Sequence, residues 1–392
     1  MRIVIVTDQY APMVGGVPAV TRSLARSLAG RGHAVAVLAP SPGGRGRRTA
    51  DGPVSVEYRG SAPWPFYPGL RLAGISVPAA RRLLDRLAPD IMHIHSPLTL
   101  GALAGKAARR RGIPVVYTNH YLPANARPSA RPRPRGFDTM FYAYLVGFAN
   151  RCTYVTAPTA TALRLLRDRG LRVPSRAISN GVDLRAYRPG PPDERLRRRY
   201  RLPANRAVIL SVGRLSPEKR ADLLLEAAAR LGPAAHLALA GAGPDEARLR
   251  ARAARLGLAG QVSFLGFVPD ADLPGLYRLA DVFAIASPAE LQSLATMEAM
   301  ASGVPVVAVR AGALPELVEH GASGYLTTPG SSRELADRLS DLAADPARRA
   351  AMAVRALARI GPHDLDRAVR AWESLYGQLA SGPRPGILEE RS

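Results

Sequence analysis

The sequence predicts an α/β protein with two doubly wound parallel-sheet domains, and three observations support this. Short apolar strands alternate with helical segments, as in Ile3–Thr7 followed by Val17–Ala29. Glycines stand at several strand-to-helix turns. With 392 residues, the chain is too long for one ordinary core. We expect a first domain at 1–184, a linker at 185–206, a second domain at 207–362, and a final helix with its tail at 363–392.

Positive charge is concentrated in the first half of the chain. Residues 1–200 hold 32 Lys and Arg against 10 Asp and Glu, giving +22, whereas residues 201–392 hold 22 against 21, giving +1. This asymmetry indicates that the first half faces something anionic: membrane phospholipid, a phosphorylated acceptor or nucleic acid. Nucleic acid is not expected, because the chain lacks a recognition motif and a platform of stacked aromatic residues.

The single cysteine, Cys152, excludes an internal disulfide and fits a reducing compartment. No apolar run reaches the roughly 18 residues needed to span a bilayer. The sequence therefore predicts a cytoplasmic protein, either soluble or peripheral on the inner face of the membrane.

The stretch Phe283–Val309 reads as strand, polar turn, helix and strand. Glu290 lies in the turn and Glu298 lies on the helix, expected at about Ser293–Ser302, so both carboxylates can face one crevice. Such a unit presents backbone N–H groups and a positive helix terminus at the carboxyl edge of a sheet, where phosphates bind.

The pattern of Glu290, seven residues, Glu298 and then Ala-Met-Ala-Ser-Gly-Val-Pro-Val-Val resembles the signature of family-4 retaining glycosyltransferases of the GT-B fold. The resemblance covers nearly the whole chain. It implies two Rossmann-like domains facing across a cleft, with a C-terminal helix crossing back to the first domain. It also implies a hexosyltransferase that forms an α-glycoside from a nucleoside-diphosphate sugar without a metal or cofactor.

A second motif, GRLSPEKRADLLLEAA at 213–228, places Arg214 and Lys219 between a strand and a helix. Two cations and free N–H donors at such a turn suit a diphosphate. Lys219 is one of only two lysines in a chain that otherwise uses arginine for positive charge. By resemblance, the expected catalytic residues are Glu290, His120, Arg214 and Lys219. The expected donor-binding residues are Gly15, Gly16, Arg214, Lys219, Val268, Glu290, Leu291, Ser293, Leu294 and Glu298.

Polar residues also follow strands of the first domain. Gly15 and Gly16 precede a helix, and His120 stands at the carboxyl end of the strand Val115–Thr118, where ligands bind in such sheets. The resemblance implies that a histidine here contacts the donor sugar. His93 and His95 share one face of a strand but lack further metal ligands at suitable spacing. The acceptor-side candidates are Asp8, Tyr10, His95 and Asn119.

Two basic segments have open interpretations. Arg45, Arg47 and Arg48 lie near the aromatic residues Trp64, Phe66 and Tyr67, which suits either a membrane-interface patch or a lid over the acceptor. Residues 122–136 hold Arg127, Arg131, Arg133 and Arg135 among prolines and read as an extended loop.

The acceptor is the least constrained part of the prediction. Many relatives have Gly-Phe-Gly after the first glutamate, where this chain has Leu291, Gln292 and Ser293, and glutamine here resembles lipid-directed members such as diacylglycerol glucosyltransferases and phosphatidylinositol mannosyltransferases. We therefore expect a membrane lipid or lipid-linked acceptor. A soluble acceptor such as an inositol phosphate or natural-product core is the alternative, followed by a nucleotide-sugar epimerase. The sugar, the nucleotide and the oligomeric state stay open.

Overall fold

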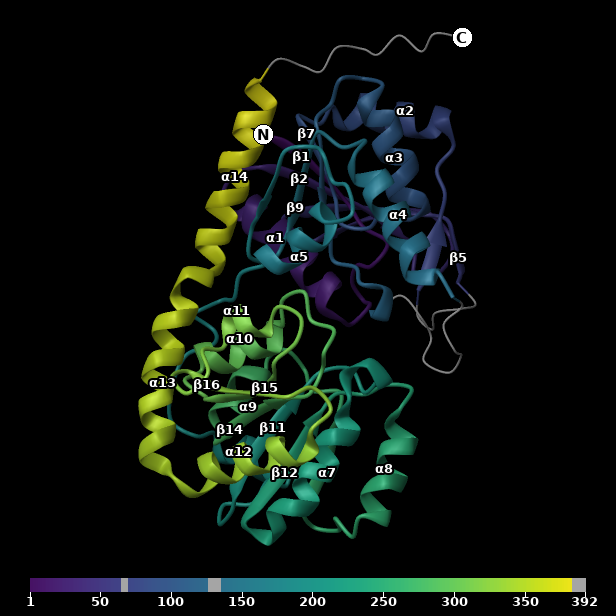
Figure 1. The fold of residues 1–392 in the computed structure, drawn as a ribbon. Helices are drawn as coiled ribbons and strands as arrows, with labels where there is room; N and C mark the ends of the chain where they lie inside the picture. The colour runs from purple at the N-terminus through teal and green to yellow at the C-terminus, as the bar shows by residue number, and fades with distance from the viewer. Residues whose placement is uncertain (65–69, 126–134, 383–392) are drawn as a thin grey trace. The chain divides into compact units, whose positions relative to one another are not determined.

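The computed structural model describes residues 1–64, 70–125 and 135–382 (Figure 1). The chain divides into two compact units. Unit 1 comprises Met1–Gly181 and the segment that begins at Asp366, and unit 2 comprises Val182–Leu365. Each unit contains its own parallel sheet and its own hydrophobic core. This confirms the predicted fold class.

In unit 1 the described strands of the main sheet run in the order β10-β9-β8-β7-β1-β2-β4-β3, and all neighbours are parallel except β3 with β4. The strands are β1 (Arg2–Val6), β2 (Ala34–Pro40), β3 (Arg47–Asp51), β4 (Val54–Arg59), β7 (Ile91–Ile94), β8 (Val115–Thr118), β9 (Tyr154–Ala157) and β10 (Ser175–Ala177). A separate hairpin pairs β5 (Ser61–Pro63) with β6 (Arg71–Ala73). The helices are α1 (Gly16–Gly30), α2 (Val77–Leu87), α3 (Thr99–Arg109), α4 (Phe137–Ala149), α5 (Ala160–Arg167) and α14 (Leu365–Ser381).

The central strand β1 explains why this sheet forms. Ile3, Val4, Ile5 and Val6 are all buried, with at most 2% of each exposed, as expected for a parallel strand covered on both faces. The strand order reverses at β1, which pairs with β2 on one side and β7 on the other. Ligands of doubly wound sheets bind outside the carboxyl ends of the strands at such a reversal. The loops after β1 and β7 are therefore the places to look for a site in unit 1.

Unit 2 has the described strand order β13-β12-β11-β14-β15-β16, all parallel. The strands are β11 (Ala207–Val212), β12 (Ala235–Ala240), β13 (Val262–Gly266), β14 (Val282–Ile285), β15 (Val306–Val309) and β16 (Gly324–Thr327). The helices are α6 (Glu194–Arg199), α7 (Ala221–Leu231), α8 (Glu246–Arg255), α9 (Leu273–Arg278), α10 (Leu294–Ala301), α11 (Leu314–Leu317), α12 (Ser332–Ala344) and α13 (Pro346–Ile360). Here the order reverses between β11 and β14, so the loops after these two strands flank the expected ligand position.

Helices α7 and α12 lie side by side against the sheet of unit 2 (Figure 1). Helix α12 does so because Leu335, Leu339 and Leu342 recur at the spacing of one helical face and are buried. Its first turn is capped by Ser331, whose hydroxyl accepts a hydrogen bond from the backbone N–H of Glu334. Local sequence and packing therefore agree on this helix.

The predicted linker differs from the observed structure. Residues 185–206, expected to be a linker, contain α6, and Leu196 and Leu202 of this segment are buried in the core of unit 2. Because prolines and arginines dominate this segment, its sequence did not indicate that two of its leucines are buried. Asp272 stands at the N-cap position of α9 without a side-chain capping hydrogen bond, and it accepts a hydrogen bond from the Tyr200 hydroxyl at 2.6 Å and pairs with Arg199.

Part of the basic segment after residue 41 lies in the main sheet of unit 1. Arg47 and Arg48 lie on strand β3, where Arg48 forms an ion pair with Glu57 and Arg47 lies over the ring of Tyr58. Trp64 is 40% exposed. Phe66, Tyr67, Arg127, Arg131 and Arg133 lie outside the described residues.

Candidate active site

The sharpest site geometry lies at the strand reversal of unit 2. Lys219 ends the short 3-10 helix η2 (Pro217–Lys219) in the loop after β11, and Glu290 lies in the loop after β14. The Lys219 Nζ lies 2.6 Å from Glu290 Oε1. The lysine side chain is 31% exposed and the glutamate side chain 9% exposed, so the pair opens to solvent through the lysine. The structure thus brings together two predicted residues that are 71 positions apart.

The loop that carries Glu290 is held by backbone contacts. The carbonyl oxygen of Glu290 accepts a hydrogen bond from the N–H of Ala313 at 2.9 Å. A Cβ on Gly312 would lie 2.5 Å from this oxygen, and Gly312 has a φ of +56°. Glycine is therefore required here by the close approach of two backbones.

Arg214 lies in the same loop as Lys219 but has a different partner. Its guanidinium lies 2.8 Å from Glu218 Oε1, and this same oxygen accepts the hydroxyl of Ser216 at 2.6 Å. The loop packs backbone to backbone on the turn after β12, because a Cβ on Gly243 would lie 2.1 Å from the carbonyl oxygen of Leu215. Arg214 is 39% exposed and is oriented by Glu218, a residue that the sequence motif contained but whose role we did not predict.

Glu298 lies on α10 and is bound to tyrosines. The Tyr277 hydroxyl donates to Glu298 Oε2 at 2.8 Å, and Tyr187 forms a second hydrogen bond with this carboxylate. Burial nevertheless raises the pKa of Glu298 to about 7, because desolvation outweighs both hydrogen bonds. Neither tyrosine stood out in the sequence, since tyrosines at these positions look like ordinary core residues.

Ser293, where many relatives have glycine, fits the start of α10. Ser293 is the N-cap, and its hydroxyl oxygen accepts hydrogen bonds from the backbone N–H and the hydroxyl of Thr296. Leu291 is buried at 7% exposure, and Leu294 packs against the core of unit 2. Val268, in the loop after β13, is buried at 6% exposure. Serine therefore replaces a glycine at no cost to the local backbone.

In unit 1, the loop after β1 and the start of α1 hold four predicted residues. Gly15 has a φ of +156° and precedes the helix, and a Cβ on Gly16 would meet nothing within 4 Å. Packing among the described residues therefore gives no reason for glycine at 16. Tyr10 is buried, and its hydroxyl donates to Asp51 at 2.9 Å, so this hydroxyl is already used inside the unit.

Asp8 is the most unusual residue of this loop. It is 4% exposed, and neither of its carboxylate oxygens has a hydrogen-bond partner among the described residues. Burial raises its pKa to about 8. At pH 7 this carboxyl group is therefore largely protonated and neutral.

The histidines meet at the ends of β7 and β8. Nδ1 of His95 lies 2.9 Å from Nε2 of His120, and the two rings are stacked with centroids 5.1 Å apart. Burial lowers the pKa of His120 to about 4 and that of His95 well below its usual value. Asn119 is fully buried and accepts hydrogen bonds from the Tyr117 hydroxyl and from the backbone N–H of Tyr121, so it shapes this turn.

The two sets of predicted residues thus differ in how they are assembled. The structure joins Lys219 to Glu290 and His95 to His120. Arg214 and Glu298 belong to the same unit as the first pair, but each is bound by other side chains. In residues 1–64, 70–125 and 135–382, no three His, Cys, Asp or Glu side chains are grouped so that they could hold a metal ion.

Two Rossmann-like sheets in one chain are the architecture of the GT-B fold. Comparison with known structures supports this fold. The chain aligns with the sucrose-phosphate synthase of Thermosynechococcus elongatus at a TM-score of 0.81 and 20% identity, over 96% of this chain and 98% of that one. It aligns with Anabaena Alr3699/HepE in complex with UDP and glucose at a TM-score of 0.78 and 25% identity, over 96% of this chain and all of the other.

Sequence comparison identifies the family. Residues 14–186 match the model of "Glycosyltransferase Family 4" and residues 192–359 match "Glycosyl transferases group 1". A GDP-mannose-dependent alpha-mannosyltransferase of Mycobacterium tuberculosis is 30% identical over 96% of this chain and 98% of its own length. A D-inositol 3-phosphate glycosyltransferase of Mycolicibacterium vanbaalenii is 36% identical over 77% of this chain and 68% of its own length. A GDP-mannose-dependent alpha-(1-6)-phosphatidylinositol dimannoside mannosyltransferase of Mycobacterium tuberculosis is 28% identical over the full length of both.

The chain therefore belongs to the family-4 glycosyltransferases, with a group 1 domain in its second half. It is a glycosyltransferase.

Proposed function

We propose that the protein transfers a hexosyl group from a nucleoside-diphosphate sugar to an acceptor hydroxyl, with retention, to form an α-glycoside. The observation that carries this proposal is the contact between Lys219 and Glu290 at the strand reversal of unit 2. A partly exposed cation there is suited to a diphosphate, and a carboxylate beside it is suited to sugar hydroxyls. The UDP complex of a relative with the same fold supports a nucleotide-sugar donor.

The residues of unit 2 suggest how the leaving group is stabilised. Negative charge grows on the diphosphate as the glycosidic bond breaks, and Lys219 and Arg214 lie on one loop where they can interact with this charge. When the diphosphate binds, Lys219 exchanges Glu290 for a phosphate oxygen, and the released carboxylate becomes available to the sugar. Because two side-chain cations serve the leaving group, we propose that no metal is needed. The leaving diphosphate is the candidate base for the acceptor hydroxyl.

In this proposal Glu298 holds the ribose hydroxyls, and the backbone near Val268 contacts the base. His120 contacts the transferred sugar as a neutral imidazole, because its pKa of about 4 leaves it uncharged near pH 7. Asp8 is neutral as well, so it donates its proton in a hydrogen bond to a hydroxyl instead of repelling or binding ions.

For the acceptor, we propose a membrane lipid or a lipid-linked molecule. The full-length similarity to a phosphatidylinositol dimannoside mannosyltransferase supports this choice. The similarity to D-inositol 3-phosphate glycosyltransferases supports the second candidate, a soluble inositol phosphate. Both acceptors offer ring hydroxyls and a phosphate.

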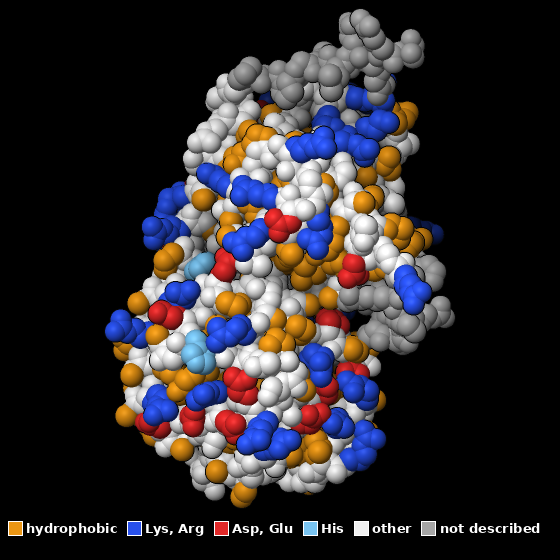
Figure 2. Space-filling view, viewed as in Figure 1, with side chains coloured by type: hydrophobic (Ala, Val, Ile, Leu, Met, Phe, Trp, Pro, Cys, Tyr) orange, Lys and Arg blue, Asp and Glu red, His pale blue; other side chains and the backbone are white. Residues whose placement is uncertain are grey.

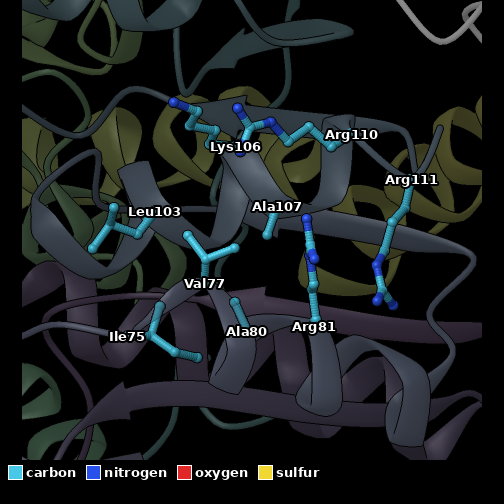
Figure 3. Close-up of a pocket in the computed structure, with 9 residues that line it drawn as sticks. All are labelled: Ile75, Val77, Ala80, Arg81, Leu103, Lys106, Ala107, Arg110 and Arg111. Carbon is cyan, nitrogen blue, oxygen red and sulfur yellow. The ribbon is translucent and has the colours of Figure 1, made fainter.

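A pocket on the surface of unit 1 supports a role for an anionic membrane. It lies between α2 and α3, encloses about 100 Å³, and is lined by Ile75, Val77, Ala80, Arg81, Leu103, Lys106, Ala107, Arg110 and Arg111 (Figure 3). In Figure 3 the apolar side chains form one part of the lining and the cationic side chains the rest. Val77 is 46% exposed and Leu103 41% exposed, which places apolar groups next to cations at the surface.

The charge around this pocket is one-sided. Helices α2 and α3 and the two residues after α3 carry one acid, Asp85, and seven cations, namely Arg81, Arg82, Arg86, Lys106, Arg109, Arg110 and Arg111. Figure 2 shows blue side chains gathered over this part of the face in view, whereas red and blue alternate over unit 2. No helix among the described residues has the length and apolar character to cross a bilayer. We propose that the face formed by α2 and α3 binds the surface of an anionic membrane.

Transfer itself is tested with purified protein, GDP-mannose and UDP-glucose in turn, and either phosphatidylinositol vesicles or inositol 3-phosphate. Release of the nucleoside diphosphate together with a glycosylated product supports the proposal, and NMR of the anomeric proton reports the α-configuration. Activity that survives EDTA supports metal independence. Consumption of the donor without a transfer product would indicate an epimerase instead.

Membrane binding is tested by sedimentation with vesicles that contain or lack phosphatidylinositol. We expect salt-sensitive binding to the anionic vesicles and its loss in an Arg81→Ala, Lys106→Ala double variant. The matched control removes two exposed cations from unit 2, Arg250 and Arg255, which changes net charge equally. Equal loss of binding in both double variants would show that net charge alone is responsible.

A further inference from the structure

A chain of buried hydrogen bonds runs from the C-terminal helix across three strands of unit 1. The hydroxyl of Tyr376 on α14 lies 2.6 Å from Nδ1 of His93 on β7. Nε2 of His93 lies 2.6 Å from Oγ1 of Thr118 at the end of β8, and this oxygen lies 2.6 Å from Oγ1 of Thr156 on β9. None of the four side chains is more than 2% exposed, so they must satisfy one another.

The chemistry of these groups gives the chain a direction. Burial lowers the pKa of His93 well below its usual value, so the ring is neutral and has one donor and one acceptor nitrogen. The phenol of Tyr376 is a far stronger proton donor than either threonine hydroxyl, and an imidazole nitrogen is a stronger acceptor than a phenol oxygen. Tyr376 therefore donates to Nδ1, which leaves the proton of His93 on Nε2, where it is donated to Thr118.

This arrangement reaches His120 by two routes. Thr118 immediately precedes Asn119 and His120, so its hydrogen bond to His93 holds the end of the strand from which His120 projects. The ring of His93 also contacts the ring of His95, with centroids 4.0 Å apart, and His95 is hydrogen-bonded to His120. Trp372 of α14 covers His93 from the other side at 4.6 Å between centroids.

We propose that Tyr376 is a positioning residue for His120. Its hydroxyl fixes the tautomer and orientation of His93, and His93 in turn sets the positions of Thr118 and His95. The C-terminal helix thereby contributes to the geometry of the candidate site through its contacts with His93. The effect on sugar transfer rests on the proposed function, whereas the effect on the histidines does not.

The hydroxyl of Tyr376 is not needed merely to hold α14 in place. Glu373 of the same helix pairs with Arg31 and His33, each at 2.9 Å, and Arg176 donates to the carbonyl oxygen of Ala371 at 2.6 Å. None of these contacts is made by the Tyr376 hydroxyl or by His93. Glu373→Gln therefore provides a matched control that weakens the same helix without altering the buried chain.

The experiment compares Tyr376→Phe with Glu373→Gln in the full chain labelled with ¹⁵N only at histidine. In the wild-type protein we expect His93 as one neutral tautomer with its proton on Nε2. Tyr376→Phe keeps the ring and its packing but should convert His93 to a mixture of tautomers and shift the signals of His95 and His120. Glu373→Gln should leave all three unchanged. Unchanged His93 and His120 signals in Tyr376→Phe would overturn the proposal.

A second measurement connects the geometry to transfer. In Tyr376→Phe we expect kcat to fall roughly tenfold, as for a small misplacement of a reacting group. The Kd of UDP or GDP, whose expected contacts lie in unit 2, should not change. Equal losses of kcat in the two variants, in proportion to their losses of thermal stability, would show a purely structural role. A wild-type protein without transfer activity would contradict the proposed function, while the histidine spectra would still decide the positioning.

Discussion

The two sheets differ in the charge of the groups that follow their strands at the point where the strand order reverses. At the strand reversal of unit 2, a lysine and a glutamate form an ion pair that reaches solvent. At the reversal of unit 1, His95, His120 and Asp8 are buried groups whose pKa values are shifted so that all are neutral near pH 7. We call the position of Lys219 and Glu290 the charged edge, and the position of His95, His120 and Asp8 the neutral edge.

Burial and partners explain the difference. Lys219 and Glu290 lie 2.6 Å apart, and the lysine side chain remains 31% exposed to solvent. For Asp8 and His95 in unit 1, desolvation is the largest cause of the pKa shift and no opposite charge among the described residues offsets it, so the uncharged form is favoured. A charged edge suits a diphosphate, and a neutral edge suits sugar hydroxyls, which exchange hydrogen bonds without a net charge.

The largest expected effect concerns the charged edge. Lys219→Ala should lower kcat by about 10² to 10³, because it removes a donor that stabilises the leaving diphosphate. Thermal stability should fall modestly, since the lysine is partly exposed but the buried Glu290 loses its partner. Steady-state kinetics and a thermal scan measure both quantities.

The control for this prediction is Arg250→Ala on α8. Arg250 is an exposed cation of the same unit and pairs with Glu246 four positions earlier. It should leave kcat within about twofold, as is usual for surface substitutions. Near-normal transfer by Lys219→Ala would contradict the assignment of the charged edge to the leaving group.

Gly16 gives the next largest effect, at the neutral edge. A Cβ there would meet no atom within 4 Å, so Gly16→Ala should fold normally. If a ligand approaches the backbone at this point, the added methyl group should reduce kcat/KM by roughly 10- to 100-fold, because close backbone approach is lost. Gly30→Ala at the other end of α1 also meets nothing within 4 Å and should be nearly neutral. Equal activity of the two variants would remove Gly16 from the site.

The contrast between the two edges also shows what the sequence could predict. The sequence predicted Glu290 and Lys219 as site residues because each lies in a motif that follows a strand, and it predicted His120 because this residue ends the strand Val115–Thr118. The partners of Arg214 and Glu298 were not predicted, because Glu218, Tyr187 and Tyr277 reach them through packing and have no distinctive spacing of their own. Alternating strands and helices sufficed for the fold class.

Charge states were equally hidden in the sequence. Asp8 reads as a polar residue after a strand, and only the three-dimensional structure shows that nothing in the described residues pairs with its carboxyl group. The prediction that residues 185–206 form a linker was wrong for a related reason. The burial of Leu196 and Leu202 depends on elements that are distant in the sequence. Local composition indicates where strands end, but it does not indicate which groups lose water.

Asp8 yields a prediction about stability. Its pKa is about 8 in the folded state and 3.8 in the unfolded chain, so between these values unfolding releases a proton. The free energy of unfolding should therefore fall as pH rises from about 4 to about 8. Asp8→Asn removes this penalty and should stabilise the protein at pH 8 by at most about 5 kcal/mol, with little effect at pH 4. Denaturant unfolding at both pH values measures it.

Asp51 is the matched control, with the opposite sign. Hydrogen bonds from Arg22, Arg26 and Tyr10 lower its pKa below the usual value, so its stabilising contribution is present above pH 4 and lost as pH falls. Asp51→Asn should therefore destabilise the protein at pH 8, where Asp8→Asn stabilises it. Two variants that shift stability in the same direction at pH 8 would contradict the inferred neutral edge.

The smallest expected effect concerns Glu298, a buried carboxyl group of unit 2. Burial raises its pKa to about 7, so it is half protonated at neutral pH. If the carboxylate accepts the ribose hydroxyls, the Kd of UDP or GDP should rise about three- to tenfold between pH 8 and pH 6, because the protonated fraction increases. Calorimetric titration across this range measures the change.

Two variants separate this effect from the ionisation of the nucleotide itself. Glu298→Gln has no carboxyl group to titrate, so any pH dependence that remains in it belongs to the diphosphate. Tyr277→Phe removes a hydrogen bond that lowers the pKa of Glu298, and it should therefore move the loss of affinity to higher pH. The same pH dependence in the wild type and in Glu298→Gln would place the ribose elsewhere, and the charged edge would then consist of the loops after β11 and β14 alone.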